Sequence, residues 1–200
     1  MKTVIYFSFL LFSASIQAQE NPLLMDTLPY FQIPEYPASY NQHTTVARMI
    51  DGLGYRYHWA TRELRKDDLA FLPGNDGQNC RTVCDHILGL THMMLNALHQ
   101  RPHKRLEAVE DMPFEEVRRR TLENLWEAST LLKKEKTPLA DSKIIFERGD
   151  NRREMEFWHI INGPLADALY HTGQIVSYRR SAGNPIDPNV SVFMGRTMEE

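Results

Sequence analysis

Apolar residues recur at intervals of three and four along four stretches of the chain, the spacing of an amphipathic helix with one buried face. The first stretch runs from about residue 41 to 66 and the second from about 80 to 99. The third begins after Pro113, and the fourth covers roughly residues 157 to 181. Four helices of this length, with connections of moderate length, predict an all-α fold, a four-helix bundle.

Turn-forming residues mark the ends of these helices. Asn79 stands where an N-cap belongs, and Pro102 follows the end of the second helix. The fourth helix is interrupted at Gly163-Pro164, where either the helix starts with proline at its first position or a longer helix kinks. Between residues 143 and 157, two partly apolar runs on either side of a turn-like segment predict a short hairpin.

Prolines break the pattern at both ends of the mature chain. Four of them between residues 19 and 40 predict an extended N-terminal arm that lies on the domain. Pro185 and Pro188 predict an extended C-terminal tail, with Val190, Val192 and Phe193 packing back. We therefore expect a four-helix bundle with its tail over residues 41–200.

Residues 1–18 have a different pattern: one lysine, an apolar run, and a small polar segment that ends at Ala18. This order is typical of a secretory signal peptide cleaved after Ala18. The apolar run is shorter than the ~20 residues that span a membrane, which disfavours the alternative of a retained anchor. We expect an exported protein, periplasmic or secreted, with no membrane span after cleavage.

Charge and cysteine content narrow the choice of partners. Removing Lys2 from 23 basic residues leaves 22 against 26 acidic ones, which gives no electrostatic reason to expect nucleic acid. The two cysteines, Cys80 and Cys84, are too few for a disulfide scaffold. A bond between them requires an irregular first helical turn, and the bonded and free states both stay open. Homodimer formation through helix faces also stays open.

Polar side chains on two of the predicted helices suggest a metal site. His86 lies on the apolar face of the second helix, where a lone histidine is more often a core residue with a polar partner. The fourth helix carries one column at spacings of four, three and four: Asp167, His171, Gln174 and Tyr178. Two ligands four apart on one helix and one from a facing helix commonly bind a metal in a bundle. We predict that His86, Asp167 and His171 are the ligands.

The remaining candidate residues are expected to have structural or solvated roles. Cys84 falls on nearly the opposite side of its helix from His86, which disfavours a joint site. Tyr57, Tyr170 and Tyr178 are predicted to line the pocket or pack in the core. We expect the other side chains to face solvent or a pocket rim: His92, His99, His103, His159, Arg179 and Arg180.

The segment 85–90, which contains His86, and the string His171-Thr172-Gly173-Gln174-Ile175-Val176 followed by Arg179 together resemble the DinB/YfiT-like family of four-helix bundles. The resemblance spans roughly residues 41–183. In that family a histidine of the second helix and two histidines four apart in the fourth bind the metal. This implies His86 and His171 as ligands, with Asp167 in place of the usual histidine and Thr172 where arginine is common.

Two functions follow as hypotheses. The first is a metal-dependent hydrolase or thiol-linked transferase of a small-molecule substrate, with Gln174 and Tyr178 orienting the substrate. Two imidazoles and a carboxylate suit zinc and leave positions open, and nickel or ferrous iron also fit. The alternative is a non-catalytic binding or scaffold protein with a weak or vacant metal site. Asp167 and the lack of a recognisable general base favour this alternative.

Overall fold

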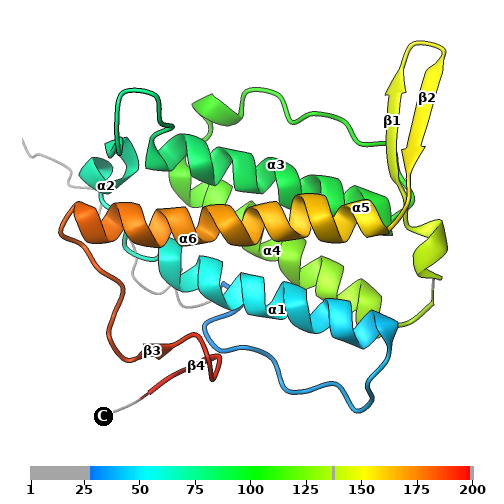
Figure 1. Ribbon diagram of the computed structural model, residues 1–200, viewed down its shortest axis with the longest axis horizontal. Helices are drawn as coiled ribbons and strands as arrows, with labels where there is room; N and C mark the ends of the chain where they lie inside the picture. The colour runs from blue at the N-terminus through cyan, green and yellow to red at the C-terminus, as the bar shows by residue number, and fades with distance from the viewer. Residues whose placement is uncertain (1–27, 137, 199–200) are drawn as a thin grey trace, which may run out of the picture.

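The computed structural model describes residues 28–136 and 138–198. The predicted signal peptide and the first part of the predicted arm lie outside the described residues. The described chain is mostly helical, with two small antiparallel sheets (Figure 1), which confirms the predicted helical class. None of its helices is both long and apolar enough to cross a membrane.

The long helices agree closely with the periodic stretches of the sequence. They are α1 (Gln42–Thr61), α3 (Cys80–Leu98), α4 (Phe114–Lys133) and α6 (Ala166–Ser181). The short helices are α2 (Lys66–Ala70), η2 (Val109–Asp111), η3 (Leu139–Asp141), α5 (Trp158–Ile160) and η4 (Ile161–Leu165). The strands are β1 (Ile144–Arg148), β2 (Asn151–Met155), β3 (Val190–Ser191) and β4 (Arg196–Thr197).

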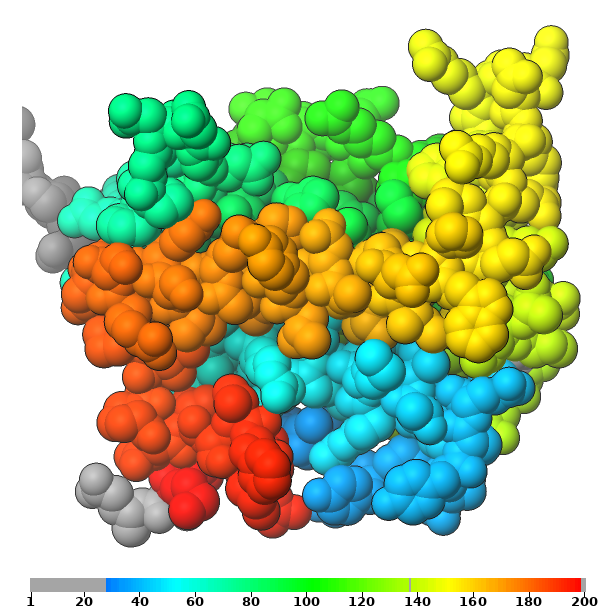
Figure 2. All heavy atoms as spheres, viewed as in Figure 1, coloured from blue at the N-terminus to red at the C-terminus, as the bar shows by residue number. Residues whose placement is uncertain are grey.

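Helices α1 and α3 each pack against both α4 and α6, so the four long helices enclose one apolar core. Each large side chain buried there stabilises the fold by about 1.5–3 kcal/mol relative to an exposed position. Helix α6 lies at the surface as the orange band across Figure 2. Fully buried core side chains include Ile50, Leu53, Ile87, Leu88, Met94, Leu122, Leu125 and Ile175.

Local hydrogen bonds fix where the helices begin and end. The Asn41 side chain accepts from the Thr44 amide (2.9 Å), and the Thr44 hydroxyl accepts from the Asn41 amide (3.0 Å). Asn79 caps α3 as predicted, accepting from the Thr82 amide at 2.8 Å. The predicted first helix is too long, because the chain turns at Glu63, whose φ of 59° lies in the left-handed region.

The fourth helix is longer than α6 alone and contains a change of helical type. The chain is helical from Trp158 to Ser181, and Ile161–Leu165 forms a π-helical turn, η4, that contains Pro164. Proline has no amide proton, and its ring collides with the carbonyl four residues earlier in an α-helix. The structure therefore has the longer, interrupted helix among the two alternatives.

Both ends of the described residues pack beside α1, where the His58 ring contacts the Pro29 carbonyl and the Tyr55 hydroxyl lies 3.5 Å from that of Thr197. The predicted hairpin is present, with Ile144 opposite Met155 and Arg148 opposite Asn151.

The prediction for the tail is wrong in one respect: Val192 and Phe193 are 47% and 93% exposed. They lie in the turn that joins β3 to β4, so they point away from the core.

Candidate metal centre

Two distant parts of the chain bring three metal-ligand side chains together. The ring centroids of His86 on α3 and His171 on α6 are 4.8 Å apart, with the ring planes at 87°. Asp167 lies between them: Oδ2 is 3.1 Å from Nε2 of His86, and Oδ1 is 3.3 Å from Nε2 of His171. One ligand atom from each residue lies within 4.8 Å of the other two. The predicted convergence of these residues is therefore found.

The donor atoms and their separations fit a small divalent ion. Zinc bonds of 2.0–2.1 Å in a tetrahedral site place ligand atoms roughly 3.3 Å apart and never more than about 4.2 Å. The two separations that involve Asp167, 3.1 and 3.3 Å, are of this size, although each is made by a different oxygen of the carboxylate. The widest separation, within 4.8 Å, closes with a side-chain movement of about 1 Å. Two imidazole nitrogens and a carboxylate oxygen also match zinc in ligand type.

A hydrogen bond to Gln174 determines the tautomer of His171. Nδ1 of His171 donates to Oε1 of Gln174 at 2.6 Å, since an amide oxygen can only accept. In the neutral imidazole, Nε2 then carries a lone pair directed at the Asp167 carboxylate. Two lone pairs at 3.3 Å repel each other unless a proton or a cation lies between them. Metal-bound histidines commonly have such a partner on the other nitrogen.

The centre lies near the surface and not in the core. The side chains of His86 and Asp167 are 44% and 41% exposed, whereas that of His171 is 16% exposed. The prediction that His86 points inward is therefore wrong. The buried face of α6 is formed by Ala168, Thr172, Ile175 and Arg179. Neighbouring positions of a helix differ by 100°, so the predicted polar column lies at the edge of that face. Solvent can therefore reach the open side of the three ligands.

The two residues predicted to orient a substrate have different surroundings. Gln174 contacts His171 directly. Tyr178 lies two turns from His171 and packs against Phe71 with ring centroids 5.8 Å apart, so its part in substrate binding stays a prediction. Tyr170 is exposed, and its ring lies 5.3 Å from that of His171. Tyr57, by contrast, is fully buried in the core.

Cys80 and Cys84 are free thiols, and both are buried. A hydrogen bond with Cys80, together with burial, raises the pKa of the Cys84 thiol well above its ordinary value. Cys84 faces the core while His86 is exposed, as expected from their spacing. A thiol in this state is a poor nucleophile and takes no part in the centre.

Two histidines expected to face solvent are half-buried instead. The rings of His92 and His103 lie 6.1 Å apart, and burial lowers the pKa of both. The His103 amide donates to the Ile145 carbonyl at 2.7 Å. The segment after α3 thus folds back onto the helix beside the hairpin. These long-range contacts have no periodic signal in the sequence. His159 is exposed and stays outside the centre.

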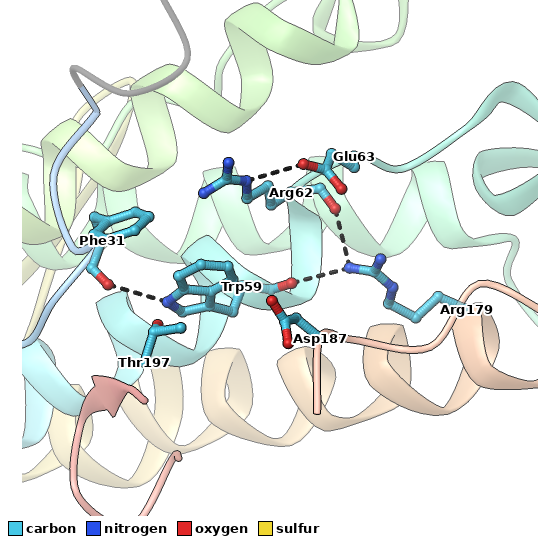
Figure 3. Close-up of a pocket in the computed structure, with 7 residues that line it drawn as sticks. All are labelled: Phe31, Trp59, Arg62, Glu63, Arg179, Asp187 and Thr197. Carbon is cyan, nitrogen blue, oxygen red and sulfur yellow. Dashed lines mark hydrogen bonds and ion pairs between the residues drawn. The ribbon is translucent and has the colours of Figure 1, made fainter. Parts of the chain in front are cut away.

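Two cavities flank the helices. One, of about 460 Å³, opens beside His86 between α3 and residues 103–110. The other, of about 530 Å³, lies between the arm, the end of α1 and the C-terminal tail (Figure 3). In the second cavity the Trp59 indole donates to the Phe31 carbonyl (3.1 Å), and the Arg62 guanidinium lies 5.1 Å from the Trp59 ring centre.

Arg179, expected to be a solvated surface residue, is 4% exposed. Its NH1 nitrogen donates to the carbonyls of Trp59 (2.9 Å), Ala60 (3.2 Å) and Arg62 (3.0 Å), as Figure 3 shows for Trp59 and Arg62. These carbonyls lie at the end of α1, where they have no partner within the helix. Arg179 therefore joins the end of α6 to the end of α1 and has a structural role.

His86, Asp167 and His171 could hold one metal ion, and their exposed side leaves room for a further ligand. No protein-family model and no curated protein sequence matches the chain. Any function must therefore be argued from the residues and their arrangement.

Proposed function

We propose that the protein holds one divalent metal ion through His86, Asp167 and His171 and is an exported metalloenzyme of the DinB/YfiT-like four-helix-bundle type. Its reaction is hydrolysis or thiol-linked transfer on a small molecule. The observation that carries the proposal is the Asp167 carboxylate lying 3.1 and 3.3 Å from two imidazole nitrogens on different helices. Zinc suits this ligand set best, and nickel or iron is the alternative.

The residues around the three ligands support catalysis more than structural binding. A structural zinc site has four protein ligands, whereas three ligands leave a position for substrate. The ion would supply Lewis acidity toward an oxygen or sulfur atom of the substrate. Gln174 holds the His171 ring in one tautomer and one orientation, because its amide oxygen accepts from Nδ1. Tyr170, exposed beside His171, would cover one side of a bound substrate.

Metal content tests the proposal. Protein purified without chelator and measured by plasma mass spectrometry is expected to contain close to one equivalent of a divalent ion. His171→Ala should lose that ion, whereas His159→Ala, which replaces an exposed histidine of α5, should retain it. Less than about a tenth of an equivalent in the wild type, or equal content in all three proteins, would refute the proposal.

The alternative function is a scaffold in which the same residues only connect two helices. It is favoured by the bond between His86 and Asp167, which joins α3 to α6 without any ion. The two functions differ in how zinc affects stability. A ligand that binds the folded state raises the unfolding midpoint as its concentration increases. A midpoint independent of zinc concentration, with an equal loss of stability in His86→Ala and Asp167→Ala, would favour the scaffold.

Export and assembly are further parts of the proposal. Cleavage after Ala18 predicts a mature chain that begins at Gln19, which N-terminal sequencing of the protein expressed with its full leader would check. A homodimer through helix faces predicts twice the mass of the mature chain in solution, measurable by light scattering. An uncleaved N-terminus would overturn the proposed export without affecting the metal site.

A further inference from the structure

Residues 103–110, called the strap below, run back along α3 in the opposite direction. At one end the ring of His103 lies 6.1 Å from that of His92. At the other end, NH2 of Arg81 donates to the carbonyls of Val109 (3.0 Å) and Met112 (2.6 Å). Figure 1 shows this connection passing above α3 before α4 begins. Contacts at both ends therefore fix the strap over the helix.

The cavity of about 460 Å³ lies between the strap and α3. Its volume is within the range of small-molecule sites, roughly 300–1,000 Å³. On α3 its lining runs along one helix face from Thr82 through His86 to Met93. At 1.5 Å per residue this face is about 16 Å long, and His86 lies about 6 Å from one end and about 10 Å from the other. A metal ligand therefore lines the cavity between its two ends.

The two ends of the cavity differ in chemistry. Toward Met93 the α3 wall is apolar, with Leu90 buried and Met93 half-buried, and the strap adds the half-buried Leu106 together with the polar side chains His103 and Arg105. Gly89 lies next to His86 in this half, and a Cβ added there would meet no atom within 4 Å. Because glycine has no side chain, the space beside His86 stays unfilled at this position.

Toward Thr82 the α3 side and the segment before it carry hydrogen-bonding groups, Gln78, Thr82 and Asp85, and the strap adds Val109 and Glu110. Asp85 is held in place by Arg81, whose Nε donates to its Oδ1 at 2.8 Å. Groups of this kind bind hydroxyl, amide or amine donors. On the α3 wall of the cavity, a polar half and an apolar half thus meet near His86.

We infer that the proposed metal centre acts on an amphipathic small molecule, such as an acyl ester, amide or thioester. The apolar chain lies along α3 from His86 toward Met93, and the hydrogen-bonding head lies toward Asp85 and Glu110. The reacting group is at the junction, beside His86. The apolar half is about 10 Å long, which accommodates a chain of roughly eight carbons. This inference rests on the proposed function, because it requires an ion at His86.

A series of alkyl hydroxamates tests the inference by binding alone. The hydroxamate group chelates zinc, and the alkyl chain probes the apolar half of the cavity. Calorimetry on the zinc-loaded protein should show affinity rising up to about fourfold per added methylene from acetohydroxamate to octanohydroxamate. The increase should stop beyond about eight carbons, where the chain reaches the end of the cavity. Octanohydroxamate binding within twofold of acetohydroxamate would overturn the inference.

Variants of the strap localise the effect. Leu106→Trp should shorten the chain length at which affinity stops rising, because the indole fills the apolar half. Leu106→Asp should flatten the dependence on chain length while acetohydroxamate affinity stays unchanged. Val192→Asp, in the exposed turn of the tail, is the matched control and should behave as wild type. Wild-type chain-length dependence in both Leu106 variants would place the chain elsewhere and overturn the inference.

The same experiment separates this inference from the proposed function. If acetohydroxamate binds but longer chains gain nothing, the metal centre stands and the amphipathic substrate is wrong. If no hydroxamate binds and zinc does not load, both are wrong.

Discussion

Replacing Arg179 with methionine removes the guanidinium that joins α6 to the end of α1 but keeps an unbranched chain of similar length. The carbonyls of Trp59, Ala60 and Arg62 then lose the Arg179 donor. NH1 has two protons, so at most two of these bonds are strong, and each bond to a charged donor contributes about 1.5–3 kcal/mol. For the two bonds to the end of α1 the sum is about 3–6 kcal/mol. Arg179→Met also removes the bond from Nε to the Asn184 carbonyl (2.6 Å), so this figure is a minimum.

An opposing contribution reduces this figure. Burial lowers the pKa of Arg179, because the charged guanidinium loses hydration. Methionine has no such cost, which offsets on the order of 1–2 kcal/mol of the lost hydrogen bonding. We therefore expect Arg179→Met to lower the free energy of unfolding by about 2–4 kcal/mol, equal to a melting temperature lower by roughly 4–16 °C for a domain of this size.

Urea unfolding followed by circular dichroism at 222 nm measures the effect. Arg180→Met is the matched control, because Arg180 is the next residue on the helix and is exposed. A substitution of that kind changes stability by no more than about 0.5 kcal/mol. Arg179→Lys should fall between the two, because an ammonium group cannot reproduce the planar fork. Equal stability of the Arg179→Met and Arg180→Met proteins would refute the reasoning.

Three further predictions concern the metal site, pH and the core. Gln174→Leu should weaken zinc binding about 10- to 100-fold in competition with a chromophoric chelator, because His171 loses the partner of Nδ1. Hydrogen bonds from Arg65 hold the pKa of Asp68 at about 2, below its ordinary 3.8. This stabilisation is therefore present above pH 4 and lost as the pH falls toward 2, and Asp68→Asn should flatten the urea midpoint across that range. Leu125→Ala should cost about 2–5 kcal/mol in urea unfolding, because Leu125 is fully buried, whereas exposed Leu169→Ala should cost little.

Much of the helical fold could be predicted from periodicity. The bounds of α3 and the start of α4 differ from the prediction by no more than one residue, since Asn79 and Pro113 mark the two starts. The approach of His86 to His171 could also be predicted, because helix geometry places Asp167 and His171 on one face of α6 and the family resemblance implies that His86 faces them. Which residues share one face of a helix can be read from their spacing in the sequence.

The depth of the site could not be predicted in the same way. A shift of one position around a helix turns a side chain by 100°, and α3 has apolar residues around much of its circumference. The sequence therefore did not distinguish a core histidine from one near the surface. Contacts between distant segments were missed for another reason: the burial of His103 and Arg179 depends on where Ile145 and the end of α1 lie in space.

The π-helical turn Ile161–Leu165 determines the direction in which the residues after it point. A π-helical turn contains one residue more than an α-helical turn, so all later side chains are rotated by about 100° relative to an uninterrupted helix. Asp167 and His171 follow directly after it. The alignment of Asp167 and His171 with His86 thus depends on the number of residues in this turn. If Ile161–Leu165 became α-helical with the same number of residues, both candidate ligands would turn by about 100°, away from α3, while every residue of the site stayed intact.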